Sequence, residues 1–319
     1  MGRESLRQNY QKLFRPWVNF NEVKQSVTKS DFQNISWPNT WEIDIGNSCN
    51  LKCIMCNPTL SDKIETEVRQ NTQHFRHFPK LLAQANENNT ANWLDTESGK
   101  HFIAQIKPTL KWLKIQGGEA LTVKSVRAML EELASQDVSL LLTTNGTVLD
   151  NRSLEILKKF RRVDISISIE AASPANDVIR YGSDWNTIRH NIMTLKQCSN
   201  ISIQINHVLQ ATSVLFLPDV IAFAETNDFH VCLLPVEIHD YLSLKSVPKS
   251  HVDNLVQSVG NMQIRHPKNQ YISQYLANIR DATEYDQNLH HRLAHYITTL
   301  DELRNQKLTP WVLNILPES

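Results

Sequence analysis

Short apolar runs alternate with longer amphipathic stretches through the middle of the chain. Each apolar run has the length of a strand, and each stretch between two runs has the apolar spacing of a helix. The predicted strands are residues 41–45, 111–115, 138–142, 163–169, 201–209 and 230–236. The predicted helices are residues 59–107, with polar interruptions, and 123–134, 151–160, 185–198 and 217–227. Strands that alternate with helices in this way predict an α/β fold of parallel βα units rather than hairpins.

The two ends of the chain do not follow this alternation. Residues 1–40 are polar with scattered aromatic side chains, and we expect one or two helices there. Helical patterns without strands return after about residue 240, and they cover residues 249–259, 271–280, 288–306 and 311–316. The sequence therefore predicts three parts: an N-terminal extension over residues 1–40, a βα domain over 41–240 and a helical C-terminal extension over 241–319.

Polar segments follow four successive predicted strands, at the point where each strand ends. In chain order they are a cysteine-containing loop at residues 46–57, Gly117-Gly118-Glu119, Thr144-Asn145-Gly146 and Ser168-Ile169-Glu170. In parallel barrels the carboxyl ends of the strands form the face where ligands bind. We therefore expect one site that all four segments share.

The loop after the first strand holds Cys49, Cys53 and Cys56 in a C-x3-C-x2-C arrangement. A structural zinc site usually takes four protein ligands, and no second cysteine pair or nearby histidine completes one here. Three thiolates can instead hold a [4Fe–4S] cluster and leave one iron open for another ligand. The spacing alone leaves a chance grouping or an incomplete zinc knuckle open.

The cysteine spacing, the Gly-Gly-Glu segment and the polar end of the fourth strand together resemble the radical S-adenosylmethionine (SAM) superfamily over residues 41–237. The resemblance implies a partial (β/α)6 TIM-like barrel with one [4Fe–4S] cluster on Cys49, Cys53 and Cys56. It implies that SAM binds the open iron and is split reductively to a 5′-deoxyadenosyl radical, which abstracts hydrogen from a substrate. The Met55-Cys56 variant resembles the group that carries SPASM or Twitch extensions. That group holds an auxiliary cluster, but this chain has no cysteine after Cys232.

The resemblance also implies roles for individual residues around SAM. Its amino group is assigned to the Gly-Gly-Glu segment, its carboxylate to Arg180, and its adenine to apolar contact with Met55. The full set of expected SAM-binding residues is Met55, Gly117, Gly118, Glu119, Asn145, Ser168, Glu170, Arg180 and Asn206. Taken singly, several have simpler readings: a tight turn with a solvated glutamate at 119, an Asn-Gly turn at 145 and a surface arginine at 180.

Composition narrows the functional classes. Lys+Arg and Asp+Glu both count 33 over 319 residues, so no bulk positive charge argues for nucleic-acid binding. No apolar run approaches membrane-spanning length, and the polar N-terminus lacks a signal-peptide core. The two remaining cysteines, Cys198 and Cys232, are scattered, which favours a reducing, cytoplasmic location. His291 and His295 share a helical face, but no further ligand supports a second metal there.

The leading functional hypothesis is a cytoplasmic radical SAM enzyme that receives electrons from a reductant such as flavodoxin or ferredoxin. The Twitch-like variant favours a peptide or protein substrate. A small molecule, such as a pterin on the way to a deazapurine, is the alternative substrate class. A non-catalytic iron–sulfur binding or sensing protein is the alternative to an enzyme.

Overall fold

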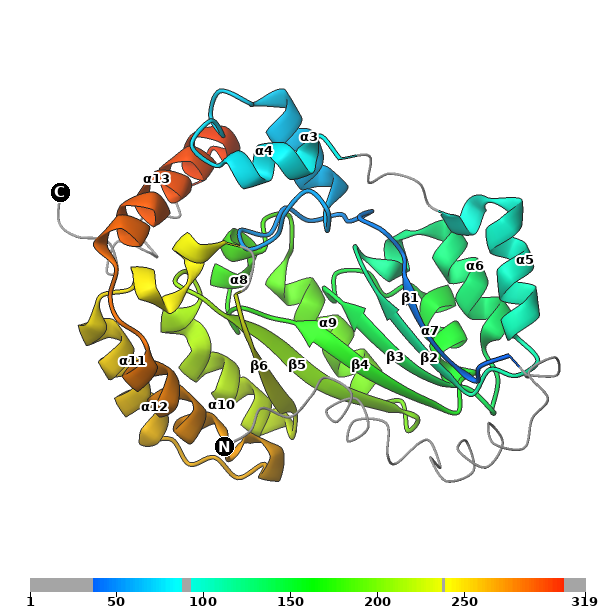
Figure 1. Cartoon of the computed structure of the whole chain (residues 1–319). Coiled ribbons are helices and arrows are strands. Elements are labelled where there is room, and N and C mark those ends of the chain that lie inside the picture. Colours follow the sequence, from blue (N-terminus) through cyan, green and yellow to red (C-terminus); the bar gives the residue numbers. More distant parts are fainter. Residues whose placement is uncertain (1–36, 88–92, 237–238, 307–319) are drawn as a thin grey trace, which may run out of the picture. The chain divides into compact units, whose positions relative to one another are not determined.

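A computed structural model describes residues 37–87, 93–236 and 239–306 (Figure 1). The chain divides into two units, Met1–Pro38 and Asn39–Ser319, and every element below belongs to the second unit. The helices expected within residues 1–40 and at 311–316 lie outside the described residues. Among the described helices, none combines the length and the hydropathy that a membrane span requires.

The centre of the second unit is a six-stranded sheet in which all neighbouring strands run parallel. The strands are β1 (Thr40–Asp44), β2 (Trp112–Gln116), β3 (Ser139–Thr144), β4 (Arg162–Ser168), β5 (Ile201–Leu209) and β6 (His230–Pro235). They lie side by side in sequence order, so each crossover returns to the next position in the sheet. This α/β topology confirms the predicted fold class of a partial, six-unit barrel.

Helices connect the strands and continue beyond the last one. They are α3 (Asp62–Gln70), α4 (Pro79–Ala85), α5 (Glu97–Ile106), α6 (Lys124–Leu133), α7 (Asn151–Lys158), α8 (Ala175–Ile179), α9 (Trp185–Lys196), α10 (Leu217–Asn227), α11 (Lys249–Gly260), α12 (Ile272–Ala282) and α13 (Gln287–Arg304). The α10 and β5 bounds agree with the prediction, and most other elements differ from it by one to three residues at an end. Helix α8 was not predicted, because five residues are too few to show a helical period.

Side-chain oxygens fix where several of these helices begin. The carboxylates of Asp150 and Asp184 accept from the third backbone N–H beyond them, at the starts of α7 and α9. Ser61 does the same for α3, where its hydroxyl accepts from Ile64 N. Such caps satisfy N–H groups that the helix itself leaves unpaired. Helix α3 therefore starts immediately after the cysteine loop, at a point that the sequence determines.

The core lies on both faces of the sheet. In β4 the consecutive side chains Ile165, Ser166 and Ile167 are all buried, which means that both faces are covered. Parallel strands buried on both faces are expected to be nearly continuous apolar runs. The three leucines at 140–142 in β3 are a run of this kind, whereas β1, β4 and β5 mix apolar and polar residues.

Helix α13 is the last described helix. It runs to the carboxyl ends of the strands, where it lies beside α3 and α4 (Figure 1). Arg304 of α13 pairs with Glu67 of α3 at 2.7 Å, and His295 of α13 stacks on Phe78, which precedes α4. The last described helix and the first helices of the unit thus pack together near the cysteine loop.

Candidate active site at the carboxyl ends of the strands

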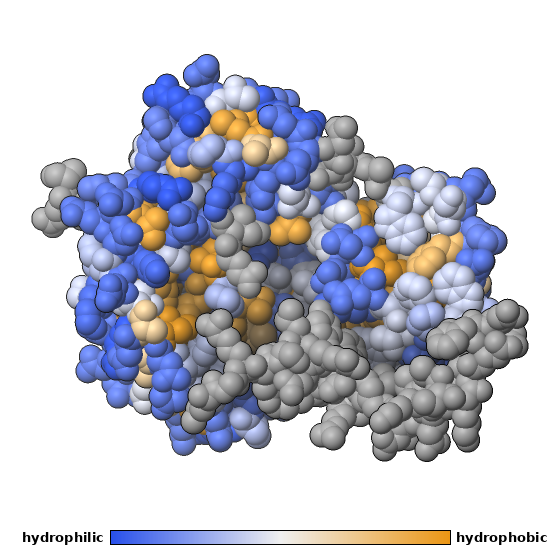
Figure 2. Space-filling model, in the orientation of Figure 1, coloured by the Kyte–Doolittle hydropathy of each residue, from blue (hydrophilic) through white to orange (hydrophobic). Residues whose placement is uncertain are grey.

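A cavity of about 420 Å³ opens where the strands end. This volume lies within the range of small-molecule sites. The residues that line it are Cys49, Cys53, Met55, Cys56, Leu60, Gly117, Gly118, Thr143, Thr144, Asn145, Ser168, Arg180, Val208, Leu234, Pro235 and Val236. Figure 2 shows apolar residues gathered toward the hollow over the sheet, with hydrophilic residues on the outer helices. The structure therefore brings the cysteine loop and the ends of β2 to β6 to one site.

Backbone hydrogen bonds give residues 46–57, called the cysteine loop below, a fixed path. Lys52 N donates to Tyr181 O and Ile54 N donates to Ile179 O, both at 2.9 Å. A tight turn closes the loop where Cys56 N donates to Cys53 O at 3.1 Å. The loop is therefore paired with the segment that follows α8 rather than extended into solvent.

The three cysteine thiols face a largely dry environment. Burial raises the pKa of Cys49 and of Cys56 to about 12, and it also raises the pKa of Cys53 despite the nearby Arg180. At neutral pH the free thiols are therefore protonated. A metal that binds them as thiolates must displace protons, so metal affinity falls as pH falls.

The donor set fits a cluster better than a single ion. The sulfurs of Cys49, Cys53 and Cys56 line one cavity. Among the described residues, however, no three His, Cys, Asp or Glu side chains are grouped as ligands of one metal ion. In a [4Fe–4S] cluster each cysteine binds a different iron, so the three sulfurs lie farther apart than around one ion. Three cysteines that share one cavity fit a cluster that takes three protein ligands and keeps one iron open.

The two glycines after β2 are explained by the cysteine loop. Gly117 has a φ of +114°, which residues with a side chain rarely adopt, and a Cβ on Gly118 would overlap the carbonyl oxygen of Ser48. Gly118 N donates to Gly46 O at 2.7 Å, and the next N–H, that of Glu119, donates to Ser48 O at 2.8 Å. In the structure the glycines let the backbone approach the start of the cysteine loop.

Glu119 has a fully buried carboxylate that already accepts three hydrogen bonds. Thr144 Oγ1 and Leu121 N donate to Oε1, at 2.7 and 3.3 Å. Asn145 N donates to Oε2 at 2.6 Å. Burial raises the pKa of Glu119, and these donors oppose that change. Glu119 is not among the cavity-lining residues, so its assignment to the SAM amino group stays a prediction.

Arg180 and Glu170 form a buried ion pair next to Cys53. Arg180 Nη2 donates to Glu170 Oε1 at 2.8 Å, and Nη1 lies 3.6 Å from the sulfur of Cys53. The second oxygen of Glu170 accepts Val208 N at 3.0 Å. Of this pair only Arg180 lines the cavity, where its Nε has no hydrogen-bond partner. The alternative of a surface arginine is wrong.

The other predicted residues divide between the cavity and its surroundings. Met55 and Ser168 line the cavity. Asn145 also lines it, and its side chain donates to Asn50 Oδ1 at 2.9 Å. Asn206 lies opposite Ser168 in the register of β4 and β5 but is not a lining residue. Gln204 donates to the Asn206 side chain at 3.1 Å.

Several lining residues were not predicted. Leu60 and Leu234 are each 38% exposed at the cavity, and Pro235 and Val236 continue its apolar side. In the sequence, the apolar residues at the end of β6 look like the end of any strand, so no pattern marks them as part of a site. Their meaning depends on the cavity, which only the fold defines.

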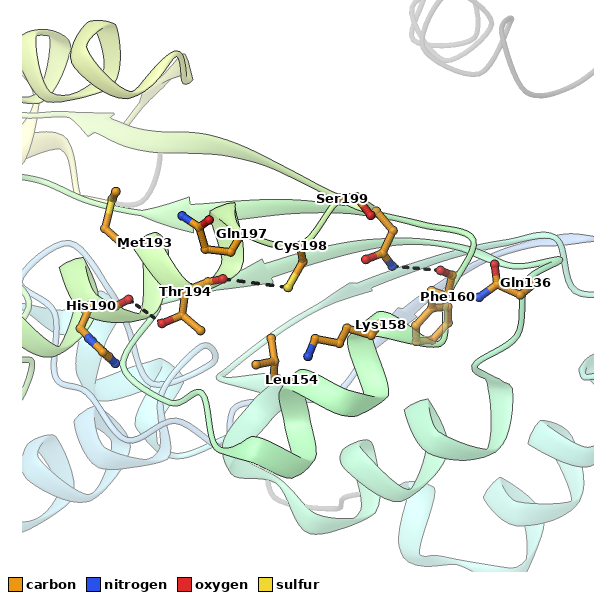
Figure 3. A pocket seen from close by; sticks show the side chains of 11 residues that line it. Gln136, Leu154, Lys158, Phe160, His190, Met193, Thr194, Gln197, Cys198 and Ser199 are labelled. Atoms are coloured by element: carbon orange, nitrogen blue, oxygen red, sulfur yellow. Dashed lines mark hydrogen bonds between the residues drawn. The ribbon is translucent and has the colours of Figure 1, made fainter.

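A second cavity, of about 790 Å³, lies against α7 and α9 and is shown in Figure 3. Lys158, His190 and Cys198 are among its lining residues, and Cys198 donates to Thr194 O at 3.9 Å. Phe160 and Asn200, which precede β4 and β5, place it at the amino ends of the strands. None of the motif residues reaches it. The motifs therefore point to the smaller cavity as the functional one.

Comparisons with known proteins show the family to which the chain belongs. Residues 43–210 match the radical SAM superfamily. The probable GTP 3′,8-cyclase of Methanocaldococcus jannaschii is 24% identical over 217 residues, which are 67% of this chain and 62% of that protein. This chain therefore spans less than two thirds of the length of that relative.

Two solved structures superpose on part of this chain. The enzyme anSMEcpe with bound AdoMet superposes with a TM-score of 0.50 at 15% identity, over 70% of this chain and 58% of the other. SuiB from Streptococcus suis, bound to S-adenosylmethionine, gives a TM-score of 0.47 at 15% identity, over 88% and 62% of the two chains. At 15% identity the likeness to anSMEcpe is one of fold.

Proposed function

Because the chain belongs to the radical SAM superfamily of enzymes, we propose that Cys49, Cys53 and Cys56 hold one [4Fe–4S] cluster at which SAM is cleaved reductively. When bound, the cluster supplies the electron that splits the SAM sulfonium into methionine and a 5′-deoxyadenosyl radical. The observation that carries this proposal is the cavity itself, which the three cysteines share with the glycine pair and the ends of the other strands.

Different residues of the cavity bind the amino-acid end and the adenine of SAM. The polar side of the cavity, at Gly118, Asn145 and Ser168, offers hydrogen-bonding groups for the amino-acid end of SAM. Arg180 brings the positive charge that a carboxylate near the cluster needs. The apolar side, which includes Met55 and Val208, covers the adenine and keeps water away from a reactive radical.

The charge of the cavity bears on the substrate. Arg180 is the one charged side chain among its described lining residues, and Glu170 already pairs with it. A triphosphate needs several cationic partners. Leu60 and Leu234 instead present exposed apolar surface at the cavity. We therefore propose a substrate that presents an uncharged, apolar group, with a side chain of a peptide or protein as the first choice.

A small molecule remains the second candidate. The cyclase relative, by its name, acts on a nucleotide, and a nucleotide-derived pterin offers a flat ring to the apolar side of the cavity. The absence of further cations among the described lining residues argues against a triphosphate-bearing substrate. A cytoplasmic reductant such as flavodoxin or ferredoxin completes the proposal.

The test is anaerobic reconstitution with iron and sulfide, followed by dithionite and SAM. We expect about four irons per chain and the formation of 5′-deoxyadenosine. The control is the variant in which Cys49, Cys53 and Cys56 are all alanine, which should bind no cluster. A wild-type chain that binds the cluster but never cleaves SAM would favour the binding or sensing alternative. An iron content near eight per chain would contradict a single cluster.

A further inference from the structure

Two backbone carbonyls of the cysteine loop accept hydrogen bonds from side chains of residues that follow β6 in the chain. His239 Nε2 lies 3.0 Å from the carbonyl oxygen of Cys56, and the Tyr296 hydroxyl lies 3.1 Å from that of Ile54. These two side chains are almost fully buried. The two carbonyls belong to the residues before and after Met55, in the stretch that ends at the third cysteine. Neither His239 nor Tyr296 belongs to a motif that the sequence analysis identified.

The orientation of His239 is determined by its neighbours. A carbonyl oxygen only accepts, so the Nε2 atom that faces Cys56 must carry a proton. In the neutral imidazole Nδ1 is then the acceptor, and the Tyr241 hydroxyl lies 3.1 Å from it. The Cys56 carbonyl therefore fixes the tautomer, and the Tyr241 hydroxyl, which donates to Nδ1, holds the ring in the orientation that donates to the loop.

Aromatic packing holds these donors in place. The ring centroids of Tyr241 and Tyr296 are 4.9 Å apart, and Phe78 lies 5.3 and 5.0 Å from them. Offset and edge-to-face ring pairs at such distances are favourable beyond the area that they bury. The donors to the cysteine loop thus come from a rigid cluster that joins three parts of the chain: the start of α4, the segment 239–242 and α13.

A second connection ties the end of α13 to the same loop. Arg304 donates to both oxygens of Glu67, at 3.1 and 2.7 Å. Glu67 also pairs with Lys52 of the loop at 2.7 Å. Lys52 and Arg304 both lie over the ring of Tyr181, at 4.9 and 5.1 Å. Helix α13 therefore contacts the loop through Tyr296 and through this ion-pair network.

We propose that His239 and Tyr296 are positioning residues of the cluster site. They fix the carbonyls on either side of Met55 and so hold the third cysteine where the cluster needs it. This inference rests on the proposed function, because it assumes a cluster on the three cysteines. On this proposal the residues that follow the sheet support the cysteine loop. In the group that carries SPASM or Twitch extensions this part of the chain holds an auxiliary cluster, but here no cysteine follows Cys232.

The test removes each donor while keeping the size of the side chain. Tyr296→Phe loses only the hydroxyl, His239→Leu loses the imidazole donor, and His239→Gln keeps an N–H donor. Tyr285→Phe, on an exposed ring, is the matched control. Each protein is reconstituted anaerobically, and iron transfer to a chelator and the EPR spectrum of the reduced cluster, with and without SAM, are recorded. Thermal unfolding of the metal-free proteins shows whether each variant folds.

We expect Tyr296→Phe and His239→Leu to lose iron about fivefold faster or more, with a changed EPR spectrum. His239→Gln should recover most of the wild-type behaviour, and Tyr285→Phe should match the wild type. Variants that fold and keep the wild-type iron-loss rate and spectrum overturn the inference and leave the proposed function standing. A variant that does not fold is replaced by the milder Tyr241→Phe, which removes the group that orients His239 and should give the same change. A wild-type chain that binds no cluster overturns both proposals.

Discussion

The guanidinium of Arg180 lies between the sulfur of Cys53 and the carboxylate of Glu170, at 3.6 and 2.8 Å. Cys53 and Arg180 are 127 positions apart in the chain. A cation in this place offsets the negative charge of a thiolate-bound cluster, and the pairing with Glu170 prevents it from turning away. The charge balance of the site therefore depends on a residue outside the cysteine loop.

Arg180→Gln is expected to destabilise the protein strongly. Glu170 would be left buried without its partner, and breaking a buried pair in this way costs about 3–5 kcal/mol. Denaturant unfolding of the metal-free protein measures the change, with Arg152→Gln in an exposed pair as the control. The double variant Arg180→Met/Glu170→Gln should regain part of the loss. In cluster-loaded protein the double variant should have a slightly lower reduction potential than the wild type, because the positive charge that is lost lies against Cys53 and the negative charge that is lost lies behind it.

Gly118→Ala should disturb the cysteine loop, because its Cβ would meet the Ser48 carbonyl. Forcing an atom into such a contact costs typically about 1–3 kcal/mol. The matched control is Gly260→Ala at the end of α11, where nothing lies within 4 Å of the added Cβ. That change should be neutral or stabilise by up to about 1 kcal/mol. Unfolding free energies and iron content after reconstitution are the measurements, and equal values for the two variants would contradict the close contact.

The Glu67–Arg304 pair gives a pH-dependent contribution to stability. Burial alone would raise the pKa of Glu67, but the hydrogen bonds from Arg304 and Lys52 outweigh it and hold the pKa below its ordinary value. A carboxylate with a lowered pKa stabilises the fold above its unfolded pKa, about 4.3, and loses this contribution as pH falls through the folded value.

Glu67→Gln should therefore lower the free energy of unfolding by about 3 kcal/mol near neutral pH. The difference from the wild type should shrink below about pH 4. Urea titrations at several pH values measure it. The control Glu97→Gln removes a fully exposed carboxylate paired with Lys100 and should show no comparable effect. A difference that stays constant into acid would mean that the pair contributes through packing alone.

Met55 should contribute apolar contact to the bound cofactor. It lines the cavity between the second and third cysteines. Met55→Phe should be tolerated at a cost below about 1.5 kcal/mol, because the exchange conserves apolar volume. Met55→Asp should lose most 5′-deoxyadenosine formation at matched iron content, because it puts a carboxylate beside an anionic cluster. Met193→Asp, on an exposed side chain of α9, is the control. Full activity of the Met55→Asp variant would place this side chain away from SAM.

The sequence predicted the sheet well because apolar residues recur along each strand, and the segments between strands have a helical pattern instead. In β5 the apolar residues include Ile201, Ile203, Ile205 and Leu209, and the predicted bounds match the observed ones. Helix α8 escaped prediction because five residues, Ala175–Ile179, leave no period to detect.

The sequence predicted which types of residue lie at the candidate site, but not the directions in which their side chains point. The cysteines and glycines were found because their spacing is local. A pattern cannot show that the carboxylate of Glu119 turns toward Thr144 and Asn145, or that Glu170 is used by Arg180. His239 and Tyr296 could not be found, because a single histidine or tyrosine in a helical region has no distinguishing pattern.

The separation of Ile54 and Tyr296 along the chain also sets the interval between the synthesis of these two residues. The two residues are 242 positions apart, and a ribosome adds about 5–20 residues each second. The cysteine loop is therefore made roughly 10–50 seconds before the helix that contacts it. During that interval the loop lacks the packing that later encloses its thiols. Iron that binds the site in its enclosed form must therefore arrive after Tyr296 has been made.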